Sequence, residues 1–159
     1  MTSSLKSTVA TKAEFVYVTY IQTTAEEAWK ALTQGDITRQ YWGYENHSDW
    51  KRGSNWEHRK AGEDKVTLVG KVEEINPPKR LVLTWAEPKD AGDPAKVSRV
   101  TFNIEPLENQ KLIRLTVIHD QLEEGSKMAK DISQGWPRVL SSLKSFLETG
   151  RPLETWSKQ

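Results

Sequence analysis

Near the end of the chain, apolar residues recur at steps of three and four, the spacing of one face of a helix. These positions are Met128, Ile132, Val139, Leu140, Leu143, Phe146 and Leu147. Gly135-Trp136-Pro137 interrupts the pattern, and Gly and Pro each weaken or bend a helix interior. The stripe stays in phase across the break, so we expect one long bent helix between Gly125 and Gly150. A second helix starting at Pro137 is the alternative, since Pro fits a first turn.

Upstream of this segment, alternating apolar and polar residues are typical of strands. Phe15 to Ile21 is the first predicted strand. Two short helices follow, one opened by a capping box at Thr23 or Thr24 and ended by Gly35, the other capped by Asp36 and ended near Gly43. Further strands are expected at 44–50, 56–59, 66–75, 81–85, 97–105 and 111–119. Consecutive strands with short connections predict an antiparallel sheet and an α+β fold.

Composition favours a single soluble domain. The chain has 159 residues, of which 36% are hydrophobic and 28% charged. A net charge of +1 without a basic face argues against nucleic acid, and the absence of Cys excludes disulfides and thiol chemistry. Because no apolar run is long enough for a signal peptide or a membrane span, we expect a cytoplasmic protein without membrane contact. The expected organisation is a flexible tail at 1–12, one domain at 13–152 and a tail at 153–159.

Aromatic residues are the main candidates for a binding site, since seven Trp against three Phe is unusual. Trp85 ends a strand on the face of Leu81 and Leu83, and Trp136 lies at the helix break. An aromatic wall with a few polar groups suits an apolar small molecule. The predicted ligand-binding residues are Trp42, Trp56, Trp85, His119, Trp136 and Leu140. Plain core packing is the alternative for each Trp, and Phe102 is interpreted as core.

His119 is the best single candidate for chemistry. Alternation places it on one strand face with Ile113, Leu115 and Val117, so it should end a core-facing row. There it would orient a ligand or act as a general base. The alternative is a structural His bonded to a nearby backbone carbonyl.

Two further residues have open interpretations. Glu74 is either an inward acid with a raised pKa or a solvent-facing residue, and a bulge near Pro77-Pro78 would reverse its side. Gly135 either lets the helix pass close to the sheet or leaves room for a ligand. No His pair at helical spacing, thiol, phosphate loop or nucleophile elbow occurs, so neither metal nor cofactor is expected.

Several stretches in order resemble the START-like (SRPBCC) helix-grip superfamily, and more narrowly the family named for the activator of the heat-shock protein 90 ATPase. They are Ile21 to Leu32, Tyr41-Trp42, Gly70 to Pro78 leading into Leu81 to Trp85, Leu115 to His119, and Gly135 to Leu140 with Leu143 to Gly150. Together they run from about Phe15 to Gly150. The chain resembles stand-alone bacterial-type members more than the eukaryotic cochaperone, which carries a separate N-terminal domain.

The resemblance implies a curved antiparallel sheet of about six or seven strands around the long C-terminal helix, with two short N-terminal helices and a cavity. We therefore expect a module that binds a small apolar or aromatic ligand. One alternative is a cochaperone-like interaction protein with a chaperone partner, and a homodimer is a further option. The other alternative is a cyclase or hydrolase that uses His119, although nothing in the sequence demands catalysis.

Overall fold

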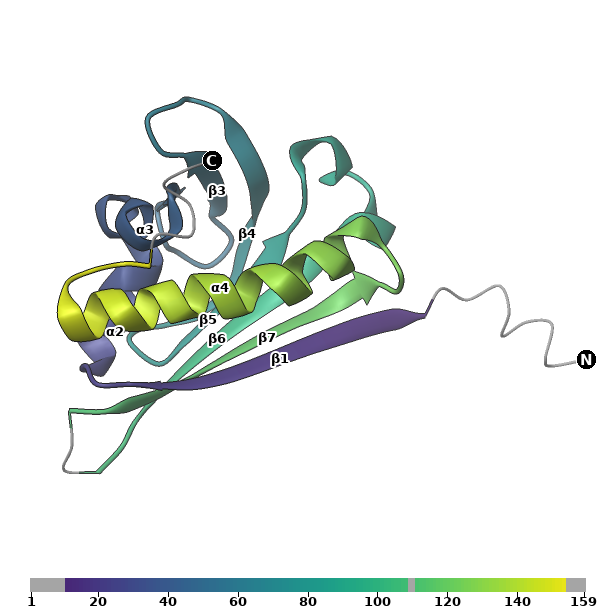
Figure 1. Ribbon diagram of the computed structural model, residues 1–159. Helices are drawn as coiled ribbons and strands as arrows, with labels where there is room; N and C mark the ends of the chain where they lie inside the picture. Colours follow the sequence, from purple (N-terminus) through teal and green to yellow (C-terminus); the bar gives the residue numbers. More distant parts are fainter. Residues whose placement is uncertain (1–10, 109–110, 154–159) are drawn as a thin grey trace, which may run out of the picture.

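A computed structural model describes residues 11–108 and 111–153, and shows one curved antiparallel sheet with a long helix against one face (Figure 1). The strand order is β1-β7-β6-β5-β4-β3-β2. The strands are β1 Lys12–Ile21, β2 Tyr44–Ser48, β3 Asn55–Lys60, β4 Val66–Asn76, β5 Arg80–Trp85, β6 Ser98–Pro106 and β7 Ile113–Glu123. The predicted tails at 1–12 and 153–159 fall almost entirely outside the described residues.

The long C-terminal segment forms one helix, α4 (Lys127–Thr149), and Pro137 lies inside it. The Ser126 side chain caps its first turn by accepting from the N–H of Ala129, and Gly150 ends it with φ of 80°. The prediction of a single helix is confirmed, and the two-helix alternative is wrong.

No helix in the described part of the chain combines the length and hydrophobicity needed to cross a membrane.

The two short helices, α2 (Ala25–Thr33) and α3 (Gly35–Trp42), lie beside the C-terminal end of α4 (Figure 1). Thr24 caps α2 by accepting from the N–H of Glu27 over 3.1 Å. Two boundary predictions are wrong, because Gly35 begins α3 rather than ending α2, and Asp36 lies in the first turn of α3 rather than at its cap. One extended residue, Gln34, ends α2 and begins α3, so the two helices abut.

Most of the predicted strands are confirmed, and the long loop at 87–97 contains two short 3-10 turns, Pro88–Asp90 and Pro94–Lys96. Strand β7 differs most from expectation, since it continues to Glu123 rather than ending at His119. The predicted core row on β7 is buried throughout: Ile113, Leu115, Val117 and His119. This row faces α4, so the core lies between the sheet and that helix.

A close approach between strands explains the position of Trp56. Its indole N–H donates to the carbonyl of Thr84 over 2.7 Å, passing over β4 at Gly70. A Cβ on Gly70 would lie 1.9 Å from the Thr84 carbonyl oxygen and 2.4 Å from the indole nitrogen of Trp56. Only Gly therefore leaves room for this hydrogen bond.

Candidate functional site

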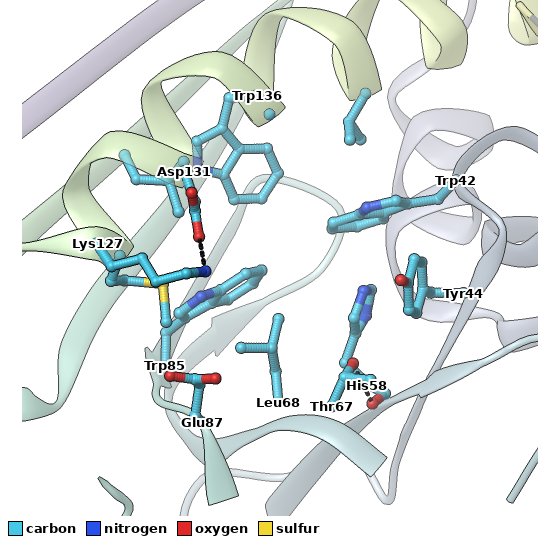
Figure 2. A pocket seen from close by; sticks show the side chains of 14 residues that line it. Trp42, Tyr44, His58, Thr67, Leu68, Trp85, Glu87, Lys127, Asp131 and Trp136 are labelled. Carbon is cyan, nitrogen blue, oxygen red and sulfur yellow. Dashed lines mark hydrogen bonds and ion pairs between the residues drawn. The ribbon is translucent and has the colours of Figure 1, made fainter. Parts of the chain in front are cut away.

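A pocket of about 280 Å³ lies between α4 and the strands β3, β4 and β5. Figure 2 shows Trp42, Trp85 and Trp136 around it. The ring centroids of Trp42 and Trp136 are 5.5 Å apart, as are those of Trp85 and Trp136. Such tilted contacts fix the rings against one another, so the wall is rigid and largely apolar. The other lining residues are Tyr44, His58, Thr67, Leu68, Glu87, Lys127, Met128, Asp131, Ile132, Gly135 and Val139.

The break in the helical stripe contributes to this space. Gly135 lines the pocket, and a Cβ added there would meet no atom within 4 Å. Of the two interpretations of Gly135, the geometry favours the one in which it leaves room, since no close contact with the sheet requires a Gly. The neighbouring Trp136 then packs against the core while the backbone at 135 stays uncovered.

One end of the pocket is charged and exposed. Lys127 and Asp131 form an ion pair of 2.7 Å one helical turn apart, and Glu87 lies across from them (Figure 2). The other end is enclosed by rings, because Tyr44 stacks on His58 at 4.7 Å and Trp42 contacts His58 at 4.6 Å. An occupant would enter past the ion pair and reach an aromatic end.

His58 lies at that enclosed end, and it is 3% exposed. The register of β2 and β3 pairs it with Asn46, whose Oδ1 lies 2.6 Å from Nδ1 of His58. The amide nitrogen of Asn46 donates to the Leu32 carbonyl over 3.0 Å, which leaves Oδ1 as the acceptor. Nδ1 of His58 therefore carries the proton, and Nε2 keeps its lone pair. Burial lowers the pKa of His58 to about 3, so the ring is neutral at neutral pH.

Trp85 supplies an unused donor. Its Nε1 is the one buried side-chain nitrogen or oxygen among the described residues that has no hydrogen-bond partner. Buried polar groups are nearly always paired, so this unpaired N–H distinguishes Trp85 from the other buried side chains of the wall.

His119 lies behind the pocket wall and is fully occupied by hydrogen bonds. Nε1 of Trp136 donates to its Nδ1 over 3.0 Å, and its Nε2 lies 2.8 Å from Oγ of Ser98. The Ser98 hydroxyl gives its only hydrogen to the Trp85 carbonyl over 3.0 Å, so it accepts from His119. With Nδ1 accepting and Nε2 donating, no lone pair remains for a base. Burial lowers the pKa of His119 to about 3, which also keeps the ring neutral. These contacts support the structural interpretation of His119, although its partners are side chains rather than a backbone carbonyl.

Half of the predicted ligand-binding residues line the pocket. Trp42, Trp85 and Trp136 do so, whereas Trp56 and Leu140 belong to the packed apolar core and His119 is buried beside it. Phe102 packs edge-to-face on Trp136 with centroids 5.8 Å apart, as a core residue would.

Sequence reasoning missed His58 and Tyr44. Alternation in Asn55–Lys60 was a usable signal for His58, because it places His58 on the same strand face as the buried Trp56. Tyr44 joins the site only because β2 pairs with β3, so no local pattern indicated it.

The remaining candidate acid lies outside the site. Glu74 is exposed, and a bulge between Val72 and Glu74 turns it away from the core. Its carboxylate accepts from Arg80 over 2.8 Å, and this hydrogen bond and charge lower the pKa of Glu74. The solvent-facing interpretation is therefore confirmed. Within residues 11–108 and 111–153, no group of three or more His, Asp and Glu side chains is arranged to hold a metal ion.

Residues 22–148 match the family model described as "Activator of Hsp90 ATPase homolog 1-like protein". The chain belongs to this family. The helix-grip resemblance inferred from the sequence is thereby confirmed. No curated protein matches the sequence significantly.

Solved structures of other proteins share the fold. The Aha1 dimer from Colwellia psychrerythraea superposes with a TM-score of 0.71 at 22% identity, covering 87% of this chain and 98% of that one. MLL2253 from Mesorhizobium loti superposes with a TM-score of 0.69 at 25% identity, covering 85% of this chain and 96% of that one. PFC0360w from Plasmodium falciparum, described as an HSP90 activator, superposes with a TM-score of 0.63 at 19% identity. The match covers 77% of this chain and 86% of that one. At such identities the likeness establishes the helix-grip fold of this family member.

Proposed function

We propose that this family member binds a small aromatic molecule in the pocket between α4 and the sheet. The observation that carries the proposal is the wall of Trp42, Trp85 and Trp136, which lines a pocket of about 280 Å³ beside an open backbone position at Gly135. Rigid rings lose little conformational freedom when a flat ligand packs on them, so burial of ligand surface becomes net affinity. Transfer of that surface from water contributes about 25 cal/mol per Å² before ordering costs.

A blocked pocket gives the decisive test. Gly135→Leu places an isobutyl group in the open space, where its Cβ meets no atom within 4 Å. We expect neutral one- and two-ring aromatic compounds to raise the melting temperature and change Trp fluorescence in the wild-type protein but not in this variant. Heat of binding, measured by titration calorimetry, confirms the site.

Gly92→Leu is the matched control, because Gly92 lies in a surface loop where a Cβ also meets nothing. It should bind the compounds as the wild type does. Silence across the panel, or binding by Gly135→Leu equal to that of Gly92→Leu, would reject the proposal.

A second candidate is self-association, and an exposed stripe on the outer side of β1 favours it. Val16, Val18 and Tyr20 are 49%, 47% and 46% exposed, and β1 is an edge strand. A second copy of this chain is the occupant we favour, because a two-fold axis would place the same stripe of both copies face to face. The Colwellia relative is also described as a dimer. Val18→Lys should then convert dimer to monomer in sedimentation experiments. A wild-type protein that stays monomeric at high concentration excludes this arrangement.

The cochaperone alternative is supported by the family description and by the Plasmodium relative. It predicts that adding this chain to a chaperone of the Hsp90 class raises its rate of ATP hydrolysis. The enzyme alternative loses its proposed base, because both ring nitrogens of His119 are engaged.

A further inference from the structure

We propose that the ligand of this pocket is a neutral aromatic compound with a hydroxyl group, which donates its hydrogen to Nε2 of His58. This inference rests on the proposed function and adds the chemical class of the occupant. Four arguments carry it: the fixed tautomer of His58, the lone pair on its Nε2, the unpaired donor of Trp85, and the aromatic rings that hold the imidazole.

The first argument is that the tautomer of His58 is fixed by its surroundings. Asn46 cannot reverse its amide, because Nδ2 is held by the Leu32 carbonyl and a reversed amide would set oxygen against oxygen. The backbone N–H of Asn46 donates to Oγ1 of Thr38 over 3.1 Å, which further fixes its position. His58 must therefore donate from Nδ1 to Asn46, and Nε2 remains an acceptor.

The second argument is that this acceptor has no protein partner. Nε2 of His58 makes no hydrogen bond within the described residues, and because Nε1 of Trp85 is the one buried unpaired side-chain atom there, Nε2 is in contact with the pocket space. Figure 2 shows the imidazole standing between Leu68 and Tyr44, beneath Trp42. Leu68 and Trp42 offer it carbon atoms and a ring face, and the hydroxyl of Thr67 donates to the backbone carbonyl of His58 instead. An occupant with a hydrogen to donate would satisfy the nitrogen, whereas an aprotic one would leave it unpaired and buried.

The third argument is that Trp85 requires the opposite partner. Its Nε1–H is buried and unpaired, and the ring centroids of Trp85 and His58 are 6.1 Å apart in the same wall. The same wall therefore holds one acceptor without a partner and one donor without a partner. A hydroxyl oxygen accepts as well as donates, so a hydroxylated aromatic molecule carries both functions. A carboxylate has no hydrogen for His58, and its charge would be buried beside a neutral ring.

The fourth argument is that the rings hold His58 in place. It stacks on Tyr44 with an interplanar angle of 12° and contacts Trp42 and Trp56 at other faces. An imidazole held on several sides keeps its Nε2 direction fixed, which is what recognition of a hydroxyl group requires.

The test compares four probes of equal ring size on the wild-type protein at pH 7 by titration calorimetry. These are 2-naphthol, 2-fluoronaphthalene, 2-methoxynaphthalene and 2-naphthoate. We expect 2-naphthol to bind at least about tenfold more tightly than the fluoro and methoxy compounds, which lack a donor. A pocket without a hydrogen-bond partner would show the reverse order, because burying the hydroxyl then costs desolvation.

A direct readout comes from the nitrogen resonances of the two buried His rings. Addition of 2-naphthol should shift Nε2 of His58 in long-range ¹H–¹⁵N spectra and leave His119 almost unchanged. His58→Phe keeps the aromatic packing and removes the acceptor, so the preference for 2-naphthol should vanish while 2-fluoronaphthalene still binds. The wild-type spectra keep the test decisive if this variant folds poorly.

The outcomes separate the two proposals. Equal affinity for 2-naphthol and 2-fluoronaphthalene, with no shift at His58, overturns hydroxyl recognition and leaves aromatic binding standing. Preference for 2-naphthoate overturns it as well. Absence of binding by all four probes counts against the proposed function itself.

Discussion

Nε1 of Trp136 donates a hydrogen bond to Nδ1 of His119 over 3.0 Å, which ties helix α4 to strand β7 through two buried side chains. The bond continues through Ser98 to the backbone carbonyl of Trp85. Each N–H and O–H of this hydrogen-bonded series, from Trp136 through His119 and Ser98, has an acceptor, so the series adds specificity to the core. It also sets the positions of Trp136 and Trp85, which form two sides of the pocket.

Trp136→Phe and Trp85→Phe should differ in their effect on stability although both residues are buried, at 3% and 4% exposed. The first change leaves Nδ1 of His119 without its donor, while the second removes an N–H that has no partner. We expect Trp136→Phe to lower the free energy of unfolding by about 1–3 kcal/mol more than Trp85→Phe does. Urea denaturation measures both, and equal losses would show that the hydrogen bond contributes nothing net.

The two buried His residues should have opposite tautomers. His58 carries its hydrogen on Nδ1, set by Asn46, and His119 carries it on Nε2, set by Trp136 and Ser98. Long-range ¹H–¹⁵N correlation spectra distinguish the two forms for each ring. The same tautomer at both positions would contradict the hydrogen-bond assignments.

Stability should fall as the solution is acidified below about pH 6.5. Burial lowers the pKa of both His58 and His119 to about 3 in the folded chain, whereas an unfolded His titrates near about 6.5. Between these values only the unfolded state takes up protons, so the stabilisation is complete above pH 6.5 and is lost as the pH falls toward 3. Each ring adds up to about 1.4 kcal/mol per pH unit to the slope of the free energy of unfolding against pH.

Urea titrations between pH 7.5 and 5 isolate this effect from the carboxylates. Arg80 lowers the pKa of Glu74, and Lys144 lowers that of Glu148, so their own losses begin only below the ordinary carboxylate value of 4.5. His58→Phe should halve the slope over that range. A free energy of unfolding that stays constant from pH 7.5 to 5 would show that neither ring is held neutral.

Two glycines should respond to Ala in opposite directions. Gly135→Ala adds a methyl group in open space inside α4, and we expect it to stabilise the protein by about 0.5–1 kcal/mol. Gly70→Ala forces a methyl group to within 1.9 Å of the Thr84 carbonyl oxygen, so a large loss of stability is expected. Thermal unfolding of the two variants tests the pair, and a destabilised Gly135→Ala would mean that this position is tightly packed.

Local patterns predicted the elements well where one physical cause dominates. Period-two alternation identified β1, β5 and the buried face of β7, because a half-buried strand needs apolar residues on one side only. The in-phase stripe identified α4 as one helix across Pro137. At Gln34-Gly35-Asp36 the same residues fit the end of one helix or the start of the next, so the boundary was misplaced.

The site was only partly predictable. Trp42, Trp85 and Trp136 were expected from their aromatic type and their places on the short helix, a core-facing strand and the helix break, and all three line the pocket. His119 met the same criteria and yet lies in the core, because partners on β6 and α4 take both of its nitrogens. His58 became a candidate only once pairing of β2 with β3 set Asn46 beside it.

The sequence by itself determined the succession of strands and helices, since burial patterns act locally and each element carries its own, and its resemblance to a known family implied the helix-grip arrangement. The tertiary structure decided which aromatic rings face a space and which His keeps a free lone pair. Those properties depend on hydrogen bonds between residues far apart in the chain, such as Trp136 with His119, and no local pattern of hydrophobicity encodes them.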